Sequence, residues 1–176
     1  TIDGLVLLQP TIFNDHRGYF MESFHKKNIN NLIGDINFVQ DNESESSRGV
    51  LRGLHFQKPP YAQSKLVRCV KGIVLDVALD LRKMSKTYGH FETTVLSSEN
   101  KEQLFVPKGF AHGFIVLSQS AVLSYKVDNY YNPKSESGII WNDPDLNIDW
   151  KINKKEIIVS EKDKSLPTFN NIISPF

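Results

Sequence analysis

The sequence predicts a mainly β protein, an antiparallel sandwich or barrel, and two observations support this fold class. Apolar residues recur at every second position over many short segments, which is the period of a strand with two distinct faces. Gly, Pro, Asn and Ser separate these segments, as in antiparallel all-β folds. Segment 72–81 shows the pattern most clearly, since one expected face carries Ile73, Leu75, Val77, Leu79 and Leu81 and the other carries Val74, Asp76, Ala78 and Asp80.

The other elements follow from the same kind of pattern. Segments rich in β-branched or aromatic residues are expected as strands at 51–57, 65–70, 92–97, 101–107, 113–117, 121–127 and 138–143. The polar stretches 42–49 and 82–89 are expected as loops, and 25–34 as a short helix that ends at Gly34. The C-terminal part, from about residue 152, is rich in turn-forming residues and is expected to form a tail packed against the barrel.

Length, charge and cysteine usage narrow the class of protein. The chain of 176 residues has no repeat and no Gly/Ser linker, so we expect one domain over 1–176. Its net charge of +1 supplies no basic field for nucleic acid, and no apolar run approaches the roughly 20 residues that span a bilayer. The N-terminus does not look like a signal peptide, and the single cysteine, Cys69, allows no internal disulfide. We expect a cytoplasmic protein that binds neither nucleic acid nor membrane.

Several ionisable residues share an expected strand face with apolar neighbours. His55 aligns with Leu51, Gly53 and Gln57, Lys65 with Val67 and Cys69, His112 with Phe114 and Val116, and Tyr125 with Leu123 and Val127. Each of them also has a structural explanation, as a core histidine or tyrosine with bonded polar atoms or a lysine that extends to water. If the faces turn towards one cavity, that cavity would hold His55, Lys65, Asp76, His112 and Tyr125.

Three kinds of chemistry have weak support in the sequence. A metal site is disfavoured because neither His55 nor His112 has a second histidine close by, and Lys65 would oppose a cation. Cys69 lies in an apolar run, and the sequence has no G-x-S-x-G elbow for nucleophilic hydrolysis. Nucleotide-binding glycine motifs are also missing. Acid–base chemistry by histidine and tyrosine remains.

A series of motifs in order along the chain resembles one known family. These motifs are DHRGYFMESF, FVQDN, VLRGLHFQ, AQSKLVRCVKG, LDVALDLRK, SSENKEQLFVPKGFAHGF, YKVDNYYNP, IIWNDPDLNIDW and SEKD. Together they resemble the dTDP-4-dehydrorhamnose 3,5-epimerase family (RmlC-like cupins) from about residue 4 to residue 167. The resemblance implies a cupin-type jelly roll and a homodimer in which an N-terminal segment reaches into the partner's site.

The resemblance also implies roles for individual residues. His55 matches the base that takes a proton next to the C4 ketone of the substrate, and Asp163 matches its carboxylate partner. Tyr125 matches the acid that returns a proton on the opposite face. Lys65 and His112 match residues around the ketone oxygen and the sugar, with Asp76 in support.

The nucleotide and its diphosphate are assigned to a second set of positions by the same resemblance. Tyr131 matches an aromatic ring that stacks on thymine, and the diphosphate and nucleotide contacts match Arg17, Glu22, Gln40, Asn42, Arg52, Glu136 and Lys162. Because Arg17 belongs to the N-terminal segment, it is expected to serve the neighbouring active site of a dimer. The implied substrate is a dTDP-linked 4-keto-6-deoxy sugar.

Elementary chemistry agrees with these residue types. A proton α to a ketone is weakly acidic, so a base poised near neutral pH needs help from a cation at the oxygen that becomes an enolate. Inversion needs a second, separate proton donor, and no step requires a metal or a cofactor. We therefore expect 3,5-epimerisation of dTDP-4-dehydro-6-deoxy-D-glucose. The alternatives are epimerisation at C3 alone or on another nucleotide-linked 4-keto sugar, a non-catalytic sugar-nucleotide-binding cupin, and a metal-dependent cupin enzyme.

Overall fold

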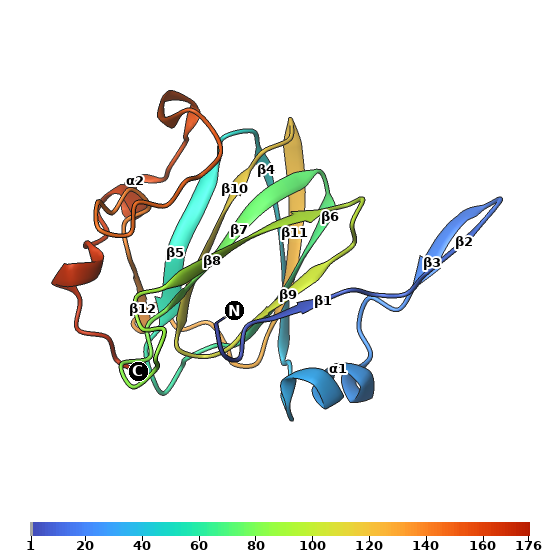
Figure 1. Ribbon diagram of the computed structural model, residues 1–176, viewed down its shortest axis with the longest axis horizontal. Helices are drawn as coiled ribbons and strands as arrows, with labels where there is room; N and C mark the ends of the chain where they lie inside the picture. Colours follow the sequence, from blue (N-terminus) through green and yellow to red (C-terminus); the bar gives the residue numbers. More distant parts are fainter. Residues whose placement is uncertain (1) are drawn as a thin grey trace.

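Two facing antiparallel sheets form the body of the protein in a computed structural model that describes residues 2–176 (Figure 1). The first sheet has the order β1-β9-β6-β11-β4, with bounds Val6–Leu8, Gln103–Val106, Lys65–Lys71, Ser120–Val127 and Gln40–Ser47. The second has the order β12-β5-β10-β7-β8, with bounds Glu136–Gly138, Leu51–Gln57, Phe110–Val116, Ile73–Asp80 and Phe91–Ser97. The predicted mainly β class is confirmed, and the architecture is a sandwich whose sheets are not closed into a barrel.

The period-2 pattern of β7 sorts its side chains between two separate cores. Val74 and Ala78 lie between the sheets with Val67, Leu104 and Leu123 of the first sheet. The alternate residues of β7 lie on the outer face of the second sheet, where they pack with Ile139, Trp150, Val159, Ile172 and Phe176. The C-terminal tail therefore covers this outer face, as expected, and turns it into a second core.

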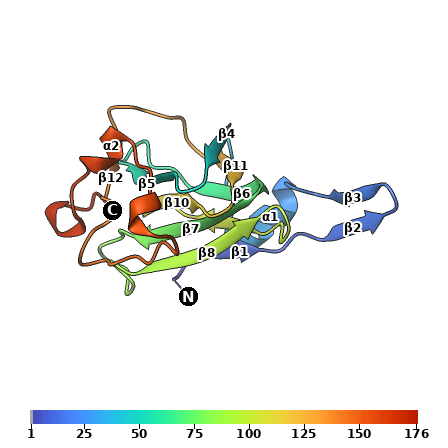
Figure 2. The ribbon, with the colours of Figure 1, turned by 90° about the horizontal axis from the view of Figure 1, so that it is seen from above.

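The C-terminal tail consists of short turns and helices rather than another sheet. It contains η1 (Lys154–Glu156), α2 (Glu161–Lys164) and η2 (Phe169–Asn171), and it lies beside β5 in Figures 1 and 2. One isolated parallel bridge joins Val50 to Ile158. This bridge brings the tail against the start of β5 just before α2.

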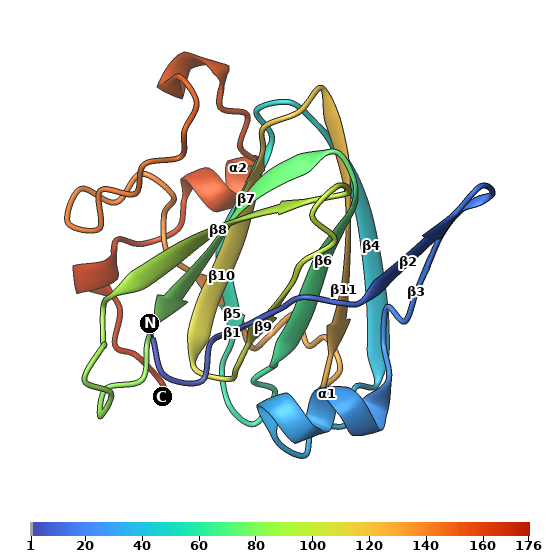
Figure 3. The same cartoon turned by 45° about the vertical axis from the view of Figure 1, so that its right-hand side comes forward.

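A short N-terminal hairpin extends away from the body. Strands β2 (Ile12–Asp15) and β3 (Gly18–Met21) pair only with each other, and all three ribbon views show them projecting outward (Figure 3). The following helix α1 (Lys26–Ile33) begins at the N-cap His25, whose ring accepts a hydrogen bond from the backbone of Asn28, and ends at Gly34. The predicted helix is confirmed. No helix among residues 2–176 has both the length and the apolar character needed to cross a membrane.

Two predictions about elements are wrong. The polar stretch 42–49, expected as a loop, lies mostly in edge strand β4, which pairs with β11 over its whole length. Its residues are polar on both faces and pair with β11 throughout, so main-chain bonding rather than an apolar face defines this strand. The segment 138–143, expected as a strand, leaves β12 at Gly138 and turns, because the carboxylate of Asp143 accepts hydrogen bonds from the backbone of Asp145, Leu146 and Phe169.

The expected face of β5 is also partly wrong. Leu51 lies in the outer core with Leu54 and Phe56, so it faces away from His55. The alternation changes because the register between β5 and β10 shifts at this point. A Cβ on Gly53 would lie 2.5 Å from the Cα of Gly113, and only glycine allows the two backbones to approach so closely.

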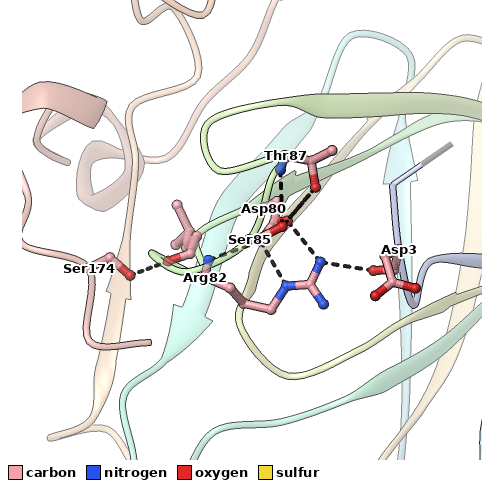
Figure 4. A network of polar contacts seen from close by, with 7 residues as sticks. Asp3, Asp80, Arg82, Ser85, Thr87 and Ser174 are labelled. Atoms are coloured by element: carbon pink, nitrogen blue, oxygen red, sulfur yellow. Dashed lines mark hydrogen bonds and ion pairs between the residues drawn. The ribbon is translucent and has the colours of Figure 1, made fainter.

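The loop 82–89, expected from the sequence, is confirmed and is held by one buried carboxylate. Asp80 at the end of β7 accepts hydrogen bonds from the side chains of Arg82, Ser85 and Thr87 (Figure 4). Arg82 also reaches the backbone of Asp3, and Ser174 donates to the carbonyl of Leu81. Burial raises the pKa of Asp80, but its hydrogen bonds prevail and lower it to about 2. Both ends of the chain are thereby anchored near this loop.

Candidate active site

A cavity of about 500 Å³ opens between the two sheets beside α2. We name it the dyad cavity, after the pair of His55 and Asp163 in its wall. Its lining includes Arg52, His55, Lys65, His112, Phe114, Tyr125, Lys162 and Asp163. A second cavity of about 250 Å³ shares His55, Lys65 and Tyr125 with it, so the two form one continuous cleft. We name this one the Tyr131 cavity; its other lining residues include Gln40, Asn42, Gln57, Gln63, Tyr131 and Glu136.

His55 on β5 pairs with Asp163 on α2. Its Nε2 lies 2.6 Å from Oδ1 of Asp163, and Oδ2 accepts a hydrogen bond of 3.3 Å from the backbone N–H of Gly53. The Ser160 side chain caps α2 by accepting a hydrogen bond from the backbone of Asp163. Burial raises the pKa of Asp163, but the hydrogen bond from His55 and the histidine charge outweigh it, so the net direction is downward. The carboxylate is ionised at neutral pH and holds the Nε2–H tautomer, which leaves Nδ1 as the basic nitrogen.

Lys65, His112 and Asp76 form a buried chain of polar contacts. The Lys65 Nζ lies 3.5 Å from Nδ1 of His112, and Nε2 of His112 lies 2.9 Å from both oxygens of Asp76. Burial lowers the pKa of Lys65 to about 8, against the attraction of Asp76 and Glu136. Burial also lowers the pKa of His112, so a neutral ring can donate to Asp76 and accept from an ammonium. A desolvated cation therefore points into the cleft.

Tyr125 reaches the cleft from the opposite wall to His55. Its strand, β11, belongs to the first sheet, whereas β5 belongs to the second. Burial raises the pKa of Tyr125, against the nearby Arg52 charge, so the phenol keeps its proton at neutral pH. Arg52 is oriented by a hydrogen bond of 3.1 Å from its Nε to Ser46 on β4. A base and a protonated phenol thus face one space from two sides.

Glu136 connects an aromatic side chain, Tyr131, with a cationic one, Lys162, at the Tyr131 cavity. It accepts a hydrogen bond of 2.7 Å from the Tyr131 hydroxyl and forms an ion pair of 2.5 Å with Lys162. The Tyr131 ring is about half exposed, at 53%. On β4, Gln40 donates to Asn42 at 2.8 Å. An exposed ring beside a lysine suits an aromatic, anionic ligand.

Comparison with known proteins places the chain in one family. The family model described as dTDP-4-dehydrorhamnose 3,5-epimerase matches residues 1–171. The dTDP-4-dehydrorhamnose 3,5-epimerase of Escherichia coli (strain K12) is 49% identical over 173 residues, which cover 98% of this chain and 93% of that protein. This chain belongs to the dTDP-4-dehydrorhamnose 3,5-epimerase family. The family and the cupin-like fold expected from the sequence are both confirmed.

Solved structures of this epimerase family superpose closely on the chain. The enzyme from Legionella pneumophila Philadelphia 1, in complex with dTDP-4-keto-L-rhamnose, is 47% identical with a TM-score of 0.94, covering 98% of this chain and 91% of that one. A 3'-monoepimerase from Streptomyces bikiniensis, in complex with dTDP-quinovose, is 34% identical with a TM-score of 0.90, covering 96% and 85%. Relatives of this fold therefore include enzymes named for inversion at one centre as well as at two.

Most of the predicted site residues line the cleft in the structure or contact residues that line it. Two of them lie elsewhere. Arg17 lies in the turn of the projecting hairpin, where it pairs with Asp15, and Glu22 lies just after β3 beside a different cavity. Within one chain they are therefore apart from His55. Among residues 2–176, no group of three or more His, Cys, Asp and Glu side chains is arranged to hold a metal ion.

Several residues that shape the site were not predicted as site residues from the sequence. Ser160 and Gly53 orient Asp163, and Ser46 orients Arg52. Gln57 and Gln63 line the Tyr131 cavity. Gly53 and Gln57 carried a signal in the sequence, since each lies two positions from His55 on the same strand. The other contacts depend on tertiary structure, which spacing along the chain does not report.

Proposed function

We propose that this protein inverts C3 and C5 of dTDP-4-dehydro-6-deoxy-D-glucose to give dTDP-4-dehydro-L-rhamnose. The names of its relatives and the sugar nucleotide bound by the Legionella enzyme support this substrate. The observation that carries the proposal is the placement of His55 and Tyr125, which line the same cleft from two different sheets. Inversion requires this arrangement, because one proton must leave from one face of the carbon and another must arrive at the opposite face.

In the first step, Nδ1 of His55 takes the proton from the carbon next to the C4 ketone. The electron pair of the broken C–H bond forms a C=C bond, and the carbonyl electron pair moves to O4 to give an enolate. Asp163, 2.6 Å from Nε2, stabilises the imidazolium that results. The ketone itself accepts the electrons, so this step needs no metal and no redox cofactor.

Lys65 is the group that we assign to the enolate oxygen. Its side chain is partly buried, and with a pKa of about 8 the ammonium is mostly protonated at neutral pH. A fixed charge in a dry site stabilises a developing oxyanion more strongly than water does, by several kcal/mol as an order of magnitude. His112 holds Lys65 from one side and is itself held by Asp76.

Tyr125 completes each inversion by donating its phenolic proton to the opposite face of the carbon. The C=C electron pair forms the new C–H bond, and the C4 carbonyl is restored. His55 has then gained one proton and Tyr125 has lost one, so a proton exchange with water resets both groups. The same two residues serve C3 and C5, since both carbons flank the C4 ketone.

The nucleotide is assigned to the Tyr131 cavity. Tyr131 would stack on thymine, with Gln40, Asn42, Arg52, Glu136 and Lys162 around the base, sugar and diphosphate. We also propose a homodimer in which the projecting hairpin inserts Arg17 and Glu22 into the partner's cleft. The hairpin of β2 and β3 projects away from the two sheets that hold the cleft, which supports this exchange (Figure 3). A cytoplasmic location remains a prediction from the sequence.

One alternative has a specific observation in its favour. The close superposition of the 3'-monoepimerase from Streptomyces bikiniensis supports inversion at C3 alone as a second candidate. Chromatography of the product separates the two, because one and two inversions give different 4-keto sugars. A protein that binds the nucleotide sugar but converts none of it would contradict both.

The test compares the purified protein with two histidine variants on dTDP-4-dehydro-6-deoxy-D-glucose. We expect His55→Ala to lose at least about 10²-fold in turnover and to remain folded. His90→Ala, which removes an exposed histidine of the loop after β7, is the control and should turn over normally. Near-normal turnover by His55→Ala would contradict the role of His55 as the base.

A further inference from the structure

Gln57 is a buried amide at the mouth of the cleft whose role the reaction does not explain. It is the last residue of β5, two positions after His55, and its side chain lines the Tyr131 cavity. Only 5% of the residue is exposed. A buried amide is costly unless its donors and acceptor are bonded, so its partners indicate what it does.

All hydrogen bonds of the Gln57 side chain go to the backbone of two loops. Its Nε2 donates to the carbonyl of Tyr61 at 2.7 Å and to the carbonyl of Tyr130 at 3.2 Å. Its Oε1 accepts from the backbone N–H of Asn132 at 2.6 Å. Both amide protons are therefore used, and two of the three bonds are to the residues on either side of Tyr131.

Two further amides connect the same loops. Gln63 donates to the carbonyl of Asn129 at 2.7 Å, and the Asn129 side chain donates to the carbonyl of Pro60 at 3.0 Å. The loop 58–64 and the loop 128–135 are thus joined through side-chain amides as well as through backbone hydrogen bonds of Lys58 to Ser135 and of Asp128 to Ser64. Of these amides, only Gln57 bonds the peptides that flank Tyr131.

The Tyr131 side chain itself has few constraints. Its ring is half exposed, and its hydroxyl has one hydrogen bond, to Glu136, which is also the ion-pair partner of Lys162. The ring position therefore depends on the backbone at Tyr130 and Asn132. Gln57 holds the Tyr130 carbonyl and the Asn132 N–H, while the Asn129 side chain accepts from the Tyr130 N–H. A stacking residue binds best when its position is set before the ligand arrives.

We propose that Gln57 is a positioning residue that fixes Tyr131 for the nucleotide base and so determines nucleotide affinity without taking part in proton transfer. This inference rests on the proposed function, which assigns the base to Tyr131. It predicts that loss of Gln57 weakens the binding of the free nucleotide dTDP and raises KM, whereas kcat at saturating substrate changes little. A purely structural role would lower the melting temperature and leave both affinities unchanged.

The experiment is a double-mutant cycle read by calorimetric titration with dTDP. Gln57→Met keeps the length of the side chain and removes every hydrogen bond, and we expect dTDP to bind about tenfold more weakly. In a Tyr131→Ala background the same substitution should change the dTDP Kd by less than about twofold, because the group that it positions is gone. KM should rise with the dTDP Kd, and kcat should stay within about threefold of wild type.

Two further variants keep the test decisive. Gln57→Glu retains the acceptor for Asn132 but turns a carboxylate towards two carbonyls, so it should weaken dTDP binding even if Gln57→Met does not fold. Ser118→Ala removes a side chain that also makes three backbone contacts, to Ile73 and Ser120, outside both cavities. It should lower the melting temperature without changing the dTDP Kd.

Either of two results would overturn the inference while the proposed function stands. One is a dTDP Kd within twofold of wild type in folded Gln57 variants, and the other is an equal loss of affinity with and without Tyr131. Failure of the wild-type protein to bind dTDP is a different result, because it would overturn the proposed function and this inference together.

Discussion

Replacing Asp163 by asparagine should disable the base while preserving its shape. The structure predicts which way the new amide points. Gly53 donates its backbone N–H to Oδ2 of Asp163, so the asparagine oxygen belongs at that position and its NH₂ group faces His55. The NH₂ group would then donate to Nε2 of His55. The ring proton would therefore lie on Nδ1, which is the nitrogen that must accept the substrate proton.

The size of the effect follows from the contact that is lost. The 2.6 Å bond between His55 and Asp163 is charge-assisted, and such a bond contributes about 1.5–3 kcal/mol. This range corresponds to about 10- to 150-fold in rate. The wrong tautomer adds to the loss, and general-base catalysis as a whole is worth about 10²–10⁴-fold. We therefore expect kcat to fall by at least about 10²-fold.

The assay measures the rate of deuterium entry into the sugar in heavy water, together with the melting temperature. Glu161→Gln is the matched control, since it removes one charge from the same helix α2 at an exposed side chain that pairs with Lys164. Its rate should equal that of the wild type. A folded Asp163→Asn variant with a rate within threefold of wild type would refute the argument about the dyad.

Three other outcomes follow from the same structure. Tyr125→Phe keeps the ring but removes the donor, so deuterium exchange by His55 should persist while inversion falls by about 10²-fold; equal losses of both would contradict a separate donor. Lys65 has a pKa of about 8, so kcat should fall as pH rises through that value and its ammonium loses the proton. In Lys65→Arg, the pH at which kcat falls should rise by at least about one unit. If that pH does not change, another group causes the fall. Asp80 has a pKa of about 2, below its value in the unfolded chain, so the stability that it contributes is complete above about pH 4 and is lost as pH falls towards 2. In urea unfolding, Asp80→Asn should remove up to about 2 kcal/mol of the acid-dependent part of the unfolding free energy. An unchanged pH dependence would contradict this.

The sequence predicts the strands that bury apolar faces and misses those that do not. The alternation in β7 sorts its residues onto two faces correctly, but it does not show that both faces are buried, one between the sheets and one under the C-terminal tail. Strand β4 is missed because its residues are polar on both faces and its stability comes from pairing with β11. The face of Leu51 is wrong because a register shift changes the alternation within β5.

The site was only partly accessible from the sequence. Spacing left open whether the faces of His55, Lys65, His112 and Tyr125 turn towards one cavity, and in the structure all four line one cleft. Asp163 lies 108 positions from His55 in the chain and came only from the family resemblance. No periodic pattern can report such a contact, because it depends on how the tail packs on β5.

The most direct test of the account follows deuterium at C3 and C5 of the sugar by NMR. The purified protein is incubated with dTDP-4-dehydro-6-deoxy-D-glucose in heavy water with a chelator present. The account predicts deuterium at both carbons and formation of dTDP-4-dehydro-L-rhamnose. Deuterium at C3 alone would make the protein a single-centre epimerase, and deuterium at neither carbon would contradict the proposed proton transfer by His55.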